Sequence, residues 1–191
     1  KVKTVTRCSD LIVDRSHKAG SGIGSTTFND GLTFSAVYGT RVQDDTISLN
    51  VPDALRILGI FESNDTANPD LPSIIVSSQS DTFTNNVIIG ETFIGSSSGA
   101  VAKVVSVVSG TQLDFVYENE KRFELEEQIS LSESGITAIL NTINIGDRNI
   151  TSNYIFDDGH REEFCDFARI TRKPDAPEPT RKIRIIFDFF S

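Results

Sequence analysis

The sequence has no methionine and no tryptophan, only two cysteines and two histidines, and few of the residues that favour helices. Alanine and leucine together supply 19 of the 191 residues, whereas isoleucine, valine, threonine, phenylalanine and tyrosine supply 68. β-Branched and aromatic side chains fit the pleated surface of a sheet better than the crowded surface of a helix. No long segment shows helical periodicity, so the composition predicts an all-β fold with little helix.

Positive charge and long apolar runs are also scarce. There are 18 Lys and Arg against 27 Asp and Glu, which gives a net charge of -9 and a pI of about 4.7. A chain of this sign repels a phosphate backbone, which excludes general nucleic-acid binding. No run approaches the roughly 18 consecutive apolar residues of a membrane span. We therefore expect neither a nucleic-acid partner nor a membrane span.

The two cysteines, Cys8 and Cys165, are too few for a disulfide framework. Two interpretations stay open: both thiols are free and buried, or the cysteines pair because the two ends of the chain meet in space. The sequence has no initiating methionine and stops within the apolar run from Ile183 to Phe190. We therefore expect it to be a piece of a longer polypeptide.

Apolar and polar residues alternate in several segments, which is the pattern of strands with one buried face. The alternating segments are 47–51, 55–57, 113–117 and 183–189. Turn signals lie between the strand segments at 29–31, 96–99, 109–110 and 157–159, and each contains a glycine, which permits positive φ. This order of strands and turns predicts antiparallel hairpins.

Two turn-rich segments, 63–73 and 144–150, divide the chain. We expect an antiparallel β-sandwich-like domain that is discontinuous, formed by residues 1–72 plus 143–191. Residues 73–142 are then an inserted module, a small β-barrel or sandwich.

The expected insert contains an internal duplication. At an offset of 36 residues Glu91 superimposes on Glu127, and the Ser-Gly turn at 96–99 superimposes on the one at 132–135. Two copies are too few for a solenoid. Each copy is expected to be a strand, a Ser-Gly turn and a strand, the alternative being a chance likeness between β sequences with Ser-Gly turns.

No segment assembles a catalytic, cofactor or metal site. Residues 20–25 (GSGIGS) lack the third glycine of a dinucleotide fingerprint and open no helix. Residues 157–163 gather four carboxylates around His160, but period-two geometry sends Glu162 and Glu163 to opposite faces, unlike a calcium loop. A charged hairpin turn is the favoured interpretation, with weak metal binding and catalysis as alternatives. We expect no catalytic residue, no cofactor and no metal, and therefore no enzyme.

Basic residues gather on both sides of the proline-rich segment 174–179. One interpretation is a pair of solvated edge strands, whose charges and prolines discourage pairing with other chains. The other is a docking surface for an acidic neighbour. The candidate partner-contact residues are Arg169, Arg172, Lys173, Arg181, Lys182 and Arg184.

Several segments together carry a resemblance to a known family. They are LRILGIFES from Leu55, GETFIGSSSGAVAKVV from Gly90, FVYENEKRF from Phe115, GDRNITSNYIFDDGHREEFCDFARITRK from Gly146, and PTRKIRIIFDFF from Pro179. Their order and spacing resemble a module of the very large virion structural proteins of contractile-tailed cyanophages and related marine phages. The resemblance covers roughly residues 45–190 and is most specific over 146–173. Family members tend to read KGQR and YYDY where this chain has DGHR and FCDF, departures that keep the turn glycine, the arginine and the aromatic spacing.

The resemblance implies a non-enzymatic structural module of a phage tail, baseplate or tail fibre that acts in particle assembly. It would be made in the host cytoplasm and reside in the virion. Its partners would be other virion proteins, the rest of a longer parent chain, and in addition a second copy of itself or a host surface glycan. The alternative is a carbohydrate-binding or receptor-binding module of a tail fibre that mediates host attachment, although three tyrosines offer few stacking platforms. A surface-polysaccharide hydrolase that uses the carboxylates of 157–166 is a third hypothesis.

Overall fold

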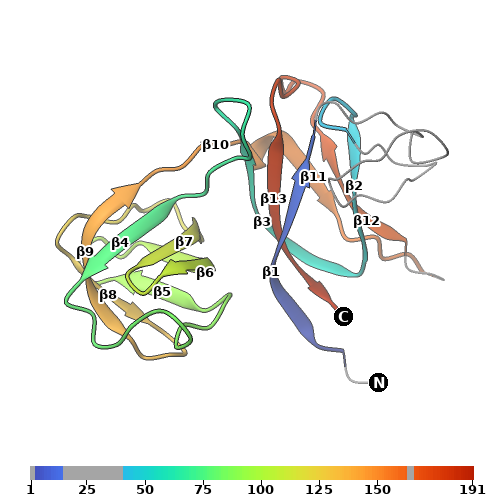
Figure 1. Ribbon diagram of the computed structural model, residues 1–191. Coiled ribbons are helices and arrows are strands. Elements are labelled where there is room, and N and C mark those ends of the chain that lie inside the picture. The colour runs from blue at the N-terminus through green and yellow to red at the C-terminus, as the bar shows by residue number, and fades with distance from the viewer. Residues whose placement is uncertain (1–2, 15–40, 163–165) are drawn as a thin grey trace. The chain divides into compact units, whose positions relative to one another are not determined.

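The computed structural model describes residues 3–14, 41–162 and 166–191, and these residues form antiparallel sheets (Figure 1). The only helix in these ranges is the short 3-10 turn η1 (Thr151–Asn153). The all-β fold predicted from the scarcity of helix formers is confirmed. The chain divides into two compact units, Lys1–Pro69 with Asp147–Ser191 and Asp70–Gly146. The boundaries expected from the sequence were 72/73 and 142/143.

The first unit consists of two sheets. A four-stranded sheet has the order β1-β13-β3-β10. Its strands are β1 (Val5–Val13), β3 (Ala54–Glu62), β10 (Arg148–Asn149) and β13 (Ile183–Phe190). A three-stranded sheet has the order β11-β12-β2. Its strands are β2 (Thr46–Pro52), β11 (Tyr154–Asp157) and β12 (Phe167–Arg172).

Both sheets of the first unit contribute to one apolar core, which makes the unit sandwich-like. Ile47 of β2 and Ile170 of β12 pack in the same cluster as Ile183 and Ile185 of β13, and all four side chains are fully buried. Burial of each such side chain contributes roughly 1.5–3 kcal/mol. The alternation read from the sequence at 47–51 and 183–189 therefore marks the residues that join the two sheets.

The basic segments lie on central strands, so their interpretation as solvated edge strands is wrong. β12 lies between β11 and β2, and β13 lies between β1 and β3. β1, from the start of the chain, returns to pair with β13 along almost its whole length. Alternation within residues 183–190 cannot reveal a pairing partner that is so distant in the sequence.

The second unit is a closed barrel with the strand order β4-β7-β6-β5-β8-β9. Its strands are β4 (Ser73–Ser77), β5 (Thr92–Gly95), β6 (Val101–Ser109), β7 (Gln112–Tyr117), β8 (Gln128–Leu131) and β9 (Thr137–Asn144). Aromatic rings fill part of its interior: Phe93 stacks on Phe123 with centroids 5.0 Å apart and meets the edge of Phe115 at 5.5 Å. A closed barrel leaves no sheet edge open to other chains.

The offset of 36 residues relates two hairpins of the barrel, β5-β6 and β8-β9. Phe93 faces Ala102 across the first hairpin, and Ile129 faces Ala138 across the second. β5 also pairs with β8, and the centre of that pairing is Ile94 opposite Ser130, two positions that are equivalent under the offset. The contact between the hairpins therefore maps onto itself when the two copies are exchanged.

β4 completes the second copy although it precedes the first copy in the sequence. Ser106 of β6 faces Asp114 of β7, and Thr142 of β9, which follows Ser106 by 36 residues, faces Ile75 of β4. β4 and β7 then pair with each other in the same reciprocal way: Phe115 donates its N–H to Pro72, and Val76 donates its N–H to Thr111. The barrel thus has a first half, β5-β6-β7, and a second half, β8-β9-β4, related by an approximate two-fold axis.

We predict that the first unit folds without the barrel. Its strands pair only with one another, and the Asn64 side chain donates a hydrogen bond to Asp147, which holds the two ends of the gap together. Replacement of residues 70–146 by a short Gly-Ser linker should leave a chain that unfolds cooperatively on heating, as followed by circular dichroism. A shortened chain without a cooperative transition, under conditions in which the complete chain has one, would contradict this prediction.

Candidate functional site

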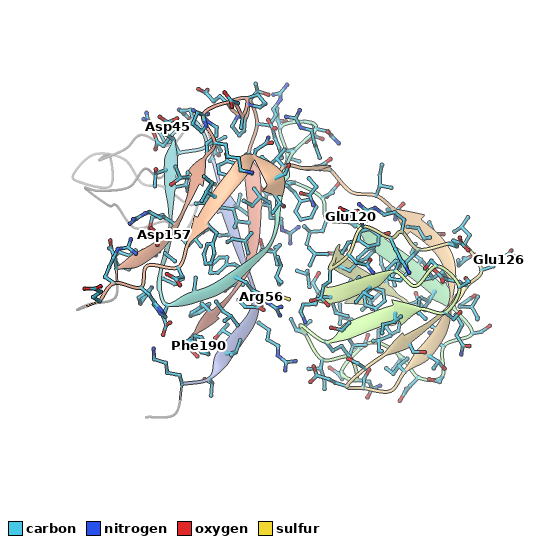
Figure 2. The ribbon with its side chains drawn as sticks, turned by 180° about the vertical axis from the view of Figure 1, so that it is seen from behind. Asp45, Arg56, Glu120, Glu126, Asp157 and Phe190 are labelled. Atoms are coloured by element: carbon cyan, nitrogen blue, oxygen red, sulfur yellow. The ribbon has the colours of Figure 1, made fainter. Side chains whose placement is uncertain are left out.

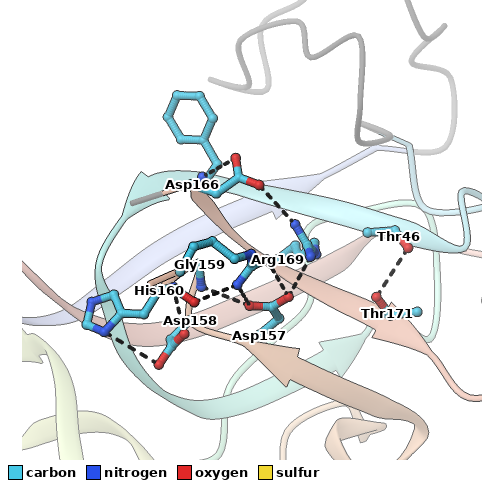
Figure 3. A network of polar contacts seen from close by, with 10 residues as sticks. Thr46, Asp157, Asp158, Gly159, His160, Asp166, Arg169 and Thr171 are labelled. Atoms are coloured by element: carbon cyan, nitrogen blue, oxygen red, sulfur yellow. Dashed lines mark hydrogen bonds and ion pairs between the residues drawn. The ribbon is translucent and has the colours of Figure 1, made fainter. Parts of the chain in front are cut away.

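The charged loop between β11 and β12 is fastened to the sheet by Asp157 (Figure 3). The Asp157 carboxylate accepts hydrogen bonds from the Gly159 N–H and from the Arg161 guanidinium, and Arg169 Nη2 lies 2.6 Å from its Oδ2. The hydrogen bonds from Arg161 hold the pKa of Asp157 below its ordinary value, against the opposing effect of partial burial. β11 and β12 are antiparallel, as the hairpin interpretation of 157–163 required. Residues 163–165, which include Cys165, lie outside the described part of the chain.

Gly159 is required by the geometry of this loop. Its φ is +82°, a conformation that side chains with a Cβ rarely adopt. A Cβ at this position would lie 2.2 Å from the carbonyl oxygen of Asp166. The turn glycine predicted from the sequence is therefore fixed both by backbone conformation and by close approach.

Asp53 is a buried acid in the connection between β2 and β3. No pattern in the sequence predicts its role. Its two carboxylate oxygens contact Lys3 Nζ and His160 Nε2, and its own carbonyl accepts the Phe190 N–H. The Lys3 contact outweighs burial and, with the contact to His160, lowers the pKa of Asp53. This arrangement joins the first residues, the β2-β3 connection and the 158–162 loop. Within the described ranges no three His, Cys, Asp or Glu residues are grouped to hold a metal ion.

Four of the six candidate contact residues form ion pairs inside the first unit. Arg169 bridges Asp157 and Asp166, and Arg184 Nη2 lies 2.6 Å from Asp10 Oδ2. Arg172 and Lys182 have acidic partners in Asp45 and Asp14 respectively.

The remaining two candidates, Lys173 and Arg181, are exposed, and their side chains make no ion pair with the described residues. They lie at the two ends of the proline-rich segment 174–179. The structure therefore uses most of the basic neighbourhood for the fold and leaves these two cations to the solvent.

The barrel contains two buried glutamates, each of which closes a turn of the opposite half. Glu127, in the second half, accepts hydrogen bonds from the N–H groups of Ser97 and Ser98 at 3.1 and 3.0 Å and from the Ser98 hydroxyl at 2.9 Å. Its Oε1 also accepts the N–H of Glu124 at 2.7 Å. The turn at 96–99 belongs to the first half, so this contact crosses between the halves.

Glu91, in the first half, makes the equivalent contact in the other direction. Its Oε2 accepts the N–H groups of Glu133 and Ser134, both at 2.9 Å, and the Ser134 hydroxyl at 3.1 Å, while its Oε1 accepts the Ile88 N–H. We call these two sets of contacts the glutamate clasps. Both carboxylates are buried, with exposed fractions of 0% for Glu91 and 5% for Glu127.

The Glu127 clasp surrounds a buried carboxylate with uncharged hydrogen-bond donors. Burial raises the pKa of Glu127, but the hydrogen bonds from Glu124, Ser98 and Ser97 together outweigh it and lower the pKa. The sequence carried one signal for this site, the pattern Glu-x4-Ser-x-Ser-Gly that occurs at both Glu91 and Glu127. In the sequence this pattern indicates a duplication, but it does not reveal that each glutamate binds the turn of the opposite half.

The first unit contains a similar contact at Glu62. Its Oε1 accepts the N–H groups of Thr180 and Arg181 at 2.7 and 3.2 Å, and its Oε2 contacts Arg148. Glu62 is 2% exposed. A buried carboxylate thus fixes the C-terminal end of the proline-rich loop to the end of β3.

Comparison of the chain with protein-family models, with curated proteins and with solved structures finds no match. In the described ranges no helix has the length and apolar character needed to cross a membrane.

We predict that Glu127→Gln destabilises the chain by about 2 kcal/mol at pH 7, because an amide cannot accept all the hydrogen bonds that the carboxylate accepts. The lowered pKa of Glu127 implies that its contribution is complete above the ordinary value of 4.5 and is lost as the pH falls below it. Urea unfolding at pH 7 and pH 3.5 measures the difference. Glu124→Gln, an exposed change in the same turn, is the control and should have little effect. An equal loss at both pH values would contradict the role of the charge.

We also predict that Glu126→Gly stabilises the barrel by roughly 0.5–1 kcal/mol. Glu126 is exposed at the surface of the barrel and has a φ of +65°, whereas the equivalent residue of the first copy, Gly90, has +80° (Figure 2). Glycine removes the strain of the left-handed conformation. Glu126→Ala keeps the strain and removes only the charge, so it should bring no such gain in thermal unfolding.

Proposed function

We propose that the chain is a non-enzymatic structural module of a phage virion, in the tail, baseplate or tail fibre, and that it acts in particle assembly. The observation that carries this proposal is the use made of its buried carboxylates. Glu62, Glu91 and Glu127 each bind backbone N–H groups of a distant loop, and Asp53 pairs with Lys3 and His160. Carboxylates that are engaged in this way hold loops in fixed positions and make the fold rigid. The resemblance to large virion proteins supports the same proposal.

The partner contact that we propose centres on Lys173 and Arg181. Both cations are exposed, and the loop between them contains Pro174, Pro177 and Pro179. Prolines restrict the loop before it binds, which lowers the entropy lost on docking. An acidic surface on a neighbouring virion protein would complement the two cations.

We predict that Lys173→Glu with Arg181→Glu reduces incorporation of the parent protein into particles, without loss of stability of the isolated chain. Incorporation is measured by quantitative mass spectrometry of purified phage, and stability by thermal unfolding. Lys121→Glu, an exposed change of the same sign in the barrel, is the matched control. A particle reconstruction in which residues 169–190 contact no other protein would refute the proposed contact.

The attachment alternative requires open aromatic surfaces. Tyr154 is buried, and Arg122 lies over the Tyr117 ring at 4.3 Å from its centroid, while Tyr38 lies outside the described residues. A glycan array distinguishes the two functions: the proposed structural role predicts no specific binding. Turnover of host polysaccharide by the purified chain would instead support the hydrolase hypothesis.

A further inference from the structure

The strand pairs and the glutamate contacts between the two halves of the barrel come in equivalent pairs. β5 of the first half pairs with β8 of the second, and β7 of the first half pairs with β4 of the second. The approximate two-fold axis passes through the middle of each of these two strand pairs. The two glutamate clasps are exchanged by the same operation. Contacts of this kind have the geometry of an isologous interface between two subunits, although here both sides belong to one chain.

The residues that the two halves contribute to this interface nevertheless differ. Phe93 of the first half faces Leu131 of the second, and Gly95 faces Ile129. A Cβ at Gly95 would lie 2.5 Å from Glu127 Oε2, so the glycine makes room for the clasp of the second half. Two first halves would instead place Phe93 opposite Gly95, and the core contact with Leu131 would be lost. The partner that fits a first half is therefore a second half.

Two short segments are the only covalent links between the halves. Residues 78–81 lead from β4 into the first half, and residues 118–122 lead out of it towards β8. Every residue in both segments is exposed or half-buried, and none has an aliphatic or aromatic side chain. Fully extended, segments of four and five residues span roughly 13 to 18 Å, at 3.3–3.6 Å per residue.

We propose that the barrel is an exchange element through which two copies of this chain associate: each chain donates its first half, residues 82–117, to the second half of the other. All cross-half strand pairs and both clasps re-form between the chains, and only the two linking segments change conformation. The partner is thus a second copy of the same chain. This inference does not rest on the proposed virion function.

Exchange requires that the barrel first opens, and the clasps set the condition for opening. At neutral pH both carboxylates hold the turn of the opposite half, so a closed monomer persists. Acid protonates Glu127, whose pKa its hydrogen bonds hold below the ordinary value, and so releases the turn at 96–99 that this carboxylate holds. Return to neutral pH at high protein concentration then lets first halves meet the second halves of other chains.

The test uses the 191-residue chain with Ile75→Cys and Gln112→Cys. These residues face each other across β4 and β7, from opposite halves, and both side chains are half-buried. Directly opposed positions on antiparallel strands bring Cβ atoms within reach of a disulfide. If oxidation precedes an acid cycle at high concentration, the bond ties the halves of one chain together and the product should remain a monomer. If the acid cycle comes first, the bond should form between chains.

Non-reducing electrophoresis separates covalent dimer from monomer. The wild-type chain, treated identically, shows whether Cys8 or Cys165 forms a bond between chains. Covalent dimer only after the acid-first order supports the proposal. Monomer in both orders, or a dimer without the bond between chains, overturns it. If the double variant does not fold, the mass of the wild-type chain after the acid cycle is measured by light scattering. A dimer that persists on dilution at neutral pH, and that reverts to monomer after a second acid cycle at low concentration, supports exchange. A monomer at every concentration refutes it.

Discussion

The structure depends on one recurring interaction, a buried carboxylate that accepts backbone N–H groups from a loop distant in the sequence. Glu91 and Glu127 do this in the barrel, and Glu62 does it in the first unit. A turn exposes N–H groups that no strand partner satisfies, and leaving them buried without a partner costs about 1–3 kcal/mol each. One carboxylate satisfies two or more of them at once. The same contact fixes the position of the loop, because the acceptor lies at the end of a strand or directly before one.

This interaction also explains how an acidic chain tolerates buried charge. The barrel residues 70–146 contain ten acidic and three basic residues, a net charge of -7, and two of those acids lie inside. Hydrogen bonds from several oriented N–H groups stabilise an ionised carboxylate as a cation would, without burying a second charge. In Glu127 these hydrogen bonds outweigh burial and lower the pKa of the carboxylate, which favours its ionised, accepting form.

Much of the fold followed from local sequence patterns, and the long-range features did not. Alternation identified β2, β7 and β13, and the Ser-Gly and Asp-Gly signals identified the hairpin turns, since both patterns are local consequences of strand geometry. Pairing of β1 with β13 was missed because no local pattern names a partner. The candidate contact residues were selected as a cluster of charge, but Arg169, Arg172, Lys182 and Arg184 have acidic partners from other segments, which only folding brings near. The clasps were visible only as a repeated spacing.

The position of β4 in the barrel decides where the two ends of the module lie. A simple order of two halves would begin with β5 and end with the third strand of the second half, and those two strands are not neighbours in the barrel. Here the third strand of the second half comes first in the sequence, as in a circularly permuted order, so the module begins on β4 and ends on β9, which pair directly through Ser73 and Asn144. Its two ends therefore lie side by side, the arrangement that lets a whole domain be carried in a single loop of a host domain.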